Sequence, residues 1–103
     1  MKRHVFWSAD AIDELDSIIR YIARENPLAA GRVATAIRSA GNRLGLAAIG
    51  RIGRISGTYE KVVPRLPYVI AYSLEALPDG SEGVVILRVI HGARNWTETD
   101  WPT

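Results

Sequence analysis

The first half of the chain is patterned as a short strand followed by two helices. Residues 4–7 are apolar enough for a strand, and Ser8 directly after them is a favourable N-cap for a helix. Asn26-Pro27 divides the helical region, because proline disfavours helical geometry in the preceding residue and is tolerated at the first position of a new helix. Around this break, apolar residues recur at the three- and four-residue spacing of one helix face, at Ile12, Leu15, Ile19 and Ile22 and then at Val33, Ile37, Ala40 and Leu44. We therefore expect an antiparallel helical hairpin.

The second half is patterned as strands. Residues 59–63, 68–77 and 84–90 are enriched in Val, Ile and Tyr, and Pro78-Asp79-Gly80 is a turn signal between the last two segments. A basic, glycine-punctuated stretch, residues 50–57, precedes them and is expected to form a loop. The order β-α-α-β-β-β predicts an α+β fold as a single domain over residues 1–103, with a mainly antiparallel sheet and the helical hairpin packed on one face.

Composition excludes several kinds of chemistry. The 103 residues are 48% hydrophobic, enough for one core, and the absence of cysteine excludes disulfides, thiolate nucleophiles and cysteine-based zinc sites. With only His4 and His91 a histidine-rich metal site is not supported, and the chain has neither a Gly-x-Ser-x-Gly elbow nor a complete P-loop. We expect no metal and no cofactor. Since no apolar run approaches the roughly 20 residues that span a bilayer, and no signal-peptide core follows Met1, we expect a cytoplasmic protein without a membrane partner.

Charge is distributed unevenly along the chain. The formal net charge is +2, but residues 1–26 carry −1, residues 27–72 carry +6 and residues 73–103 carry −3. Glu60 is the only acidic residue of the middle segment. This asymmetry predicts a face for an anionic partner, either nucleic acid or an acidic protein, although a solvated basic helix face explains it equally well.

Four segments, in order and at the right spacing, resemble the RelE/ParE family of toxins. Residues 57–64 and 66–72 resemble the family's second and third strands, and residues 86–96 resemble its last strand and the exit from it. Trp7-Ser8 followed by an acidic helix, and the Asn26-Pro27 junction, are similar to the family's first half. The resemblance covers nearly the whole chain and is closer to the ParE branch than to the RelE branch.

The resemblance implies the toxin of a type II toxin–antitoxin system, which binds a cognate antitoxin protein and reaches operator DNA only through that antitoxin. Family members of the ParE kind poison DNA gyrase, whereas those of the RelE kind cut mRNA on the ribosome. We expect a gyrase-binding toxin that is not an enzyme. A ribosome-dependent mRNA endonuclease is the alternative, and an inactive relative that only binds its antitoxin is a third hypothesis.

Four residues are the candidates for catalysis if the chain is a nuclease. By resemblance, Arg94 falls where RelE-type enzymes carry a phosphate-stabilising arginine, and Arg54 and Lys61 lie near the region that supplies their other basic groups. His91 is a candidate acid–base group, since imidazole exchanges protons near neutral pH. A histidine beside a glycine at a strand end is, however, more often structural.

The chain departs from the nuclease pattern at one position. RelE-type nucleases carry an arginine directly after the aromatic residue that opens the third strand, whereas Val69 follows Tyr68 here. Arg65 is near in sequence but lies outside the strand. This difference favours the ParE-like interpretation.

A protein-binding surface is expected whether or not the chain is an enzyme. Two helices cover one face of the sheet. Apolar residues occur at both the odd and the even positions of the strands, so they point to both faces. The face without helices should therefore expose an apolar patch that a partner covers. Arg88 is expected to project from that face, or to be a plainly exposed strand arginine. Trp96 and Trp101, in a polar tail, are interface candidates, although Trp96 alternatively caps the core. The residues expected to bind the target or the antitoxin are Arg32, Arg38, Arg51, Arg54, Arg65, Arg88, Arg94, Trp96 and Trp101.

Overall fold

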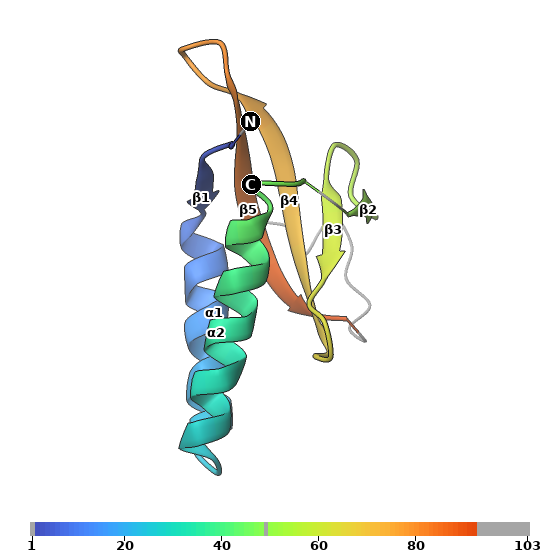
Figure 1. Cartoon of the computed structure of the whole chain (residues 1–103). Coiled ribbons are helices and arrows are strands. Elements are labelled where there is room, and N and C mark those ends of the chain that lie inside the picture. The colour runs from blue at the N-terminus through green and yellow to red at the C-terminus, as the bar shows by residue number, and fades with distance from the viewer. Residues whose placement is uncertain (1, 49, 93–103) are drawn as a thin grey trace.

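Two helices pack side by side against one face of a mostly antiparallel sheet (Figure 1). The computed structural model describes residues 2–48 and 50–92. Within these ranges the elements are β1 (Val5–Trp7), α1 (Ala9–Ala23), α2 (Pro27–Arg43), β2 (Arg51–Ile52), β3 (Tyr59–Val62), β4 (Tyr68–Ala76) and β5 (Glu82–His91). The expected α+β fold, with the helical hairpin on one face, is confirmed.

The sheet has the strand order β1-β5-β4-β3-β2. β1 runs parallel to β5, with Val5 opposite Val84, and the remaining neighbours are antiparallel. Residues 50–57 were expected to be a loop, but they contain the two-residue strand β2, which pairs with the start of β3. So short a segment has too little periodicity to be recognised in the sequence.

Both helices begin where the sequence predicts and for the predicted reason. The Ser8 hydroxyl accepts a hydrogen bond from the Ala11 amide at 3.1 Å, and the Asn26 side chain accepts one from the Ala29 amide at 3.1 Å. The apolar face of α1 is rotated from the expected one. Ile12 is 46% exposed, while Ala11 and Leu15 are buried, because the helix presents its Ala11 side to the sheet.

The end of α2 approaches β1 unusually closely. A Cβ atom on Gly41 would lie 2.5 Å from Cζ2 of Trp7 and 2.8 Å from Cδ1 of Ile86. The indole nitrogen of Trp7 also donates a hydrogen bond to the Asn42 side chain at 3.0 Å. Gly41 therefore allows the helix to lie directly on the first and last strands.

The core lies between the helices and the sheet. Its buried members from the helices include Leu15, Ile37 and Leu44, and those from the sheet include Ile70 and Tyr72. A smaller cluster of Ile55, Ala71 and Ile90 is separate from this core, and it contains no helix residue. Neither helix of the described residues is long and apolar enough to cross a bilayer.

Candidate functional site

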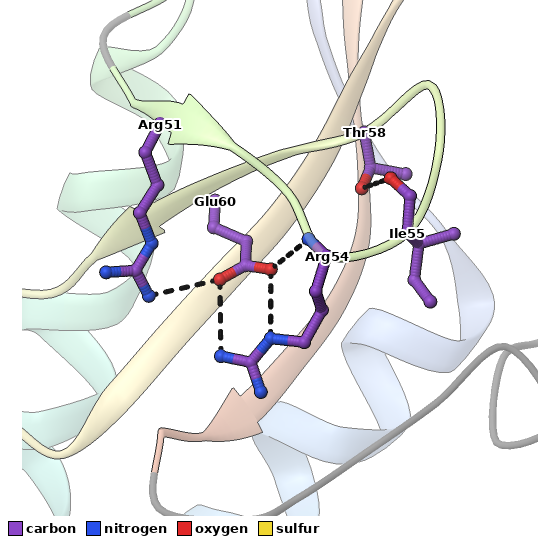
Figure 2. A network of polar contacts seen from close by, with 5 residues as sticks. All are labelled: Arg51, Arg54, Ile55, Thr58 and Glu60. Atoms are coloured by element: carbon purple, nitrogen blue, oxygen red, sulfur yellow. Dashed lines mark hydrogen bonds and ion pairs between the residues drawn. The ribbon is translucent and has the colours of Figure 1, made fainter.

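Arg51 and Arg54 both contact Glu60, which is the only acidic residue of the basic segment 27–72 (Figure 2). Glu60 on β3 is only 2% exposed, and its carboxylate accepts hydrogen bonds from the side chain of Arg51 at 3.1 Å and from the backbone amide of Arg54 at 2.8 Å. Nε of Arg54 lies 3.2 Å from the same carboxylate. Two of the expected binding cations are thus engaged inside the chain.

These contacts set the ionisation of Glu60. Burial by itself raises the pKa of the carboxyl group, but the hydrogen bonds from the Arg54 backbone and from the Arg51 and Arg54 side chains outweigh burial, so the pKa lies below its ordinary value of 4.5. At neutral pH Glu60 is therefore a carboxylate that neutralises part of the charge of the two arginines. The basic field expected over residues 50–57 is correspondingly weaker.

The glycines of this loop serve close packing. A Cβ on Gly53 would lie 2.3 Å from Oγ1 of Thr58, and one on Gly50 would lie 2.7 Å from the carbonyl oxygen of Glu60. The Thr58 hydroxyl is itself buried and donates to the Ile55 carbonyl at 2.6 Å. Gly53 therefore allows the turn between β2 and β3 to close tightly, and Gly50 allows the residue before β2 to lie against β3.

Of the two alternatives for Arg88, the plainly exposed strand arginine is wrong. It is 8% exposed, and its Nε donates to the carboxylate of Glu14 on α1 at 2.9 Å. The other oxygen of Glu14 accepts from the Val89 amide at 3.0 Å. The expectation failed because the alternation along a strand carries no information about an acid that lies 74 positions away in the chain. A binding role for Arg88 remains a prediction.

Lys61 lies on the opposite side of the sheet from Arg54. It is adjacent to Glu60 on β3, and successive side chains of a strand point to opposite faces. Its register partner Ile70 belongs to the core under the helices, whereas the partner of Glu60, Ala71, belongs to the smaller cluster. Lys61 borders a groove of about 360 Å³ together with residues at the end of α2, including Arg43.

His91 lies at the end of β5 beside Tyr68. The two rings meet edge to face, with centroids 5.7 Å apart. Both rings border a shallow depression that also involves Asp13 and Ser17 of α1, and this depression and the groove beside Lys61 have no lining residue in common. Neither of these two hollows is lined by His91 together with Arg54 or Lys61.

The remaining predicted residues are dispersed or lie outside the described ranges. Arg32 and Arg38 are exposed on α2, and neither forms an ion pair with a described residue. Arg65 is exposed in the turn between β3 and β4 with a φ of 65°. Three further predicted residues lie outside the described ranges, namely Arg94, Trp96 and Trp101.

No group of three or more His, Asp or Glu side chains within the described ranges could hold a metal ion. Arg54 and Lys61, two of the nuclease candidates, point away from each other across the sheet. Glu14 and Glu60, which engage three of the predicted cations, were missed, although the isolation of Glu60 in a basic segment was a usable signal.

The sequence of the chain matches the family model described as "ParE toxin of type II toxin-antitoxin system, parDE" over residues 5–96. The chain belongs to the ParE toxin family. The expected membership of the RelE/ParE superfamily, on the ParE side, is thereby confirmed.

Relatives of this ParE-family toxin agree with that assignment. It is 36% identical over 98 residues to "Putative toxin Y4kP" of Sinorhizobium fredii, over 94% of this chain and 96% of the relative. A structure of the chromosomal ParDE system from P. aeruginosa matches with a TM-score of 0.77 at 19% identity, over 87% of this chain and 96% of that one. The toxin–antitoxin complex RelBE2 from Mycobacterium tuberculosis matches with a TM-score of 0.57 at 22% identity, over 88% and 99%. At these identities the two structures show a common fold.

Proposed function

We propose that this ParE-family toxin arrests growth by binding a protein, DNA gyrase, and that a cognate antitoxin holds it inactive. The observation that carries the proposal is the separation of the nuclease candidates. Arg54 is engaged by the buried Glu60, while Lys61 lies on the other face of the sheet beside α2. Phosphoryl chemistry on RNA needs cations and an acid–base group around one phosphate, so this dispersal supports binding over cleavage.

The antitoxin part of the proposal rests on the family and on the solved neighbours. The ParDE and RelBE2 structures are described as toxin–antitoxin systems. By analogy, a cognate antitoxin would cover part of this chain and would connect it to operator DNA through its own DNA-binding region. A cytoplasmic location follows from such targets and is part of the same proposal.

Purified toxin tests the target directly. We expect it to inhibit supercoiling by gyrase or to stabilise cleaved DNA at substoichiometric to equimolar ratios, and to leave mRNA intact in a translating extract. Intact gyrase activity together with mRNA cleavage would replace the proposal with the ribosome-dependent nuclease. In that case Arg94→Ala should abolish cleavage while leaving antitoxin binding unchanged.

Inducible expression separates both activities from an inactive relative. A toxin arrests growth on induction, and co-expression of its antitoxin restores growth. A folded protein that allows normal growth would show that only antitoxin binding remains.

A further inference from the structure

The groove between the end of α2 and β3 has the chemistry of a protein-docking surface. Its apolar lining comes from the last turns of α2, the residues that follow it and the turn after β3, namely Ala40, Leu44, Leu46, Ala47 and Pro64. Leu46 is 67% exposed, an unusual state for a large apolar side chain that already borders a concave surface. An apolar hollow of about 360 Å³ accommodates a few side chains of a partner segment.

Two cations border the groove. Arg43 is exposed in the last turn of α2, and Lys61 projects from β3, the strand on the other side of the groove. Neither forms an ion pair with any residue of the ranges 2–48 and 50–92. The C-terminal end of α2 carries the partial negative charge of the helix dipole. Arg43 in the last turn offsets this charge, so the groove beside the end of α2 stays positive.

No carboxylate of residues 2–48 and 50–92 lines this groove. None of the lining residues is acidic, and the single acid of residues 27–72, Glu60, projects from the opposite face of the sheet toward Arg51 and Arg54. The cations expected to meet a partner at residues 51 and 54 are thus partly neutralised, whereas Arg43 and Lys61 are not. Cations that pair with no described carboxylate therefore coincide with accessible apolar surface at this groove.

We infer that the groove binds an acidic, amphipathic segment of the cognate antitoxin, with apolar side chains on Leu46 and Ala47, which are exposed, and carboxylates on Arg43 and Lys61. This inference rests on the proposed function, since it assigns a place to the antitoxin. The apolar lining favours a peptide over a nucleic acid, whose phosphates would gain nothing from it.

Charge reversal tests the cationic border. The binding partner is the full-length product of the reading frame adjacent to the toxin gene. Arg43→Glu combined with Lys61→Glu should raise the Kd by about tenfold or more and reduce its dependence on salt. The matched control, Arg20→Glu in the last turn of α1 with Arg24→Glu directly after that helix, changes the net charge equally and should alter the Kd less than about threefold. Unfolding curves confirm that both variants are folded, and Arg43→Gln with Lys61→Gln is the milder version.

Crosslinking tests the apolar lining without disturbing charge. Benzoylphenylalanine in place of Leu46 should crosslink to the partner, whereas the same residue in place of Leu28, 78% exposed at the start of α2, should not. Wild-type binding with no effect of the groove variants and no crosslink from position 46 would overturn the inference while leaving the proposed function standing. Absence of wild-type binding would overturn both. A toxin dimer lost in the groove variants, with antitoxin binding intact, would assign the groove to a second copy instead.

Discussion

At the scale of single residues, one carboxylate determines what two arginines do. Glu60 is 2% exposed, while the side chains of Arg51 and Arg54 are 58% and 34% exposed. A buried charge is costly unless it is paired and hydrogen-bonded, so the two arginines satisfy Glu60 and hold the β2–β3 loop against the sheet. Removing the acid would leave two cations close together without their common partner.

Glu60→Gln should lower the free energy of unfolding by about 2 kcal/mol at neutral pH, because it removes charge-assisted hydrogen bonds and leaves the arginines unneutralised. Because the pKa of Glu60 is lowered in the folded protein, its contribution is present above its ordinary value of 4.5 and disappears as the pH falls through the folded value. The difference between wild type and variant should therefore shrink below about pH 4.5. Urea unfolding across pH measures it.

Glu25→Gln is the control for this experiment. Glu25 is exposed and forms no ion pair with a described residue, so its removal should change stability by less than about 0.5 kcal/mol at any pH. A difference between wild type and Glu60→Gln that stays constant from pH 7 to strongly acidic conditions would contradict the role given to ionised Glu60.

At the scale of elements, α2 packs closely on the sheet because one of its residues, Gly41, has no side chain. Glycine disfavours helices, yet Gly41 lies in the last turns of α2 where Trp7 and Ile86 leave no room for a Cβ. Gly31 lies in the same helix, where an added Cβ would meet nothing within 4 Å. A substitution of Gly31 therefore changes helix propensity alone, whereas a substitution of Gly41 also changes the packing of α2 against the sheet.

Gly41→Ala should destabilise the protein by about 1–3 kcal/mol, because the new methyl group forces the helix away from β1 and β5. Gly31→Ala should stabilise it by about 0.5–1 kcal/mol through helix propensity alone. Thermal or urea unfolding of both variants checks the pair. Equal stabilisation by the two substitutions would mean that the contact of α2 with Trp7 is looser than the structure shows.

At the scale of the whole molecule, side chains at the start of the chain form hydrogen bonds with the backbone of the last strand, β5. β1 pairs with β5 only as far as Ile86, so the following part of that edge has no strand partner among the residues that the structure describes. The Ser8 hydroxyl donates to the Leu87 carbonyl at 2.9 Å, and Glu14 accepts from the Val89 amide. Side chains from the beginning of the chain thus satisfy the backbone near its end.

Amide hydrogen exchange should report this connection. In Glu14→Ala the Val89 amide should exchange at least about tenfold faster, because it loses its acceptor, whereas Glu14→Gln keeps an acceptor and should have a smaller effect. The Val84 amide, which donates to the His4 carbonyl at 2.9 Å, is the internal control. Equal acceleration at Val84 and Val89 would indicate global destabilisation and would contradict a local role for Glu14.

Much of the fold could be predicted, because its signals are local. Ser8 and Asn26 cap the helices as expected, and the strand segments were recognised from their composition. The rotation of α1 that leaves Ile12 exposed was not predicted, since spacing identifies an apolar stripe but not the angle at which it meets the sheet. β2 was missed because its two residues acquire their conformation only by pairing with β3.

The candidate site was less predictable, because it depends on pairs of distant residues. The sequence by itself determined the order of all elements except β2, the family and the excess of positive charge in residues 27–72. The tertiary structure decided which of these charges are available, by directing Glu60 to Arg51 and Arg54 and by placing Lys61 beside α2. The physical reason is that charge is a property of each residue, whereas neutralisation and burial belong to contacts that exist only after the sheet has formed.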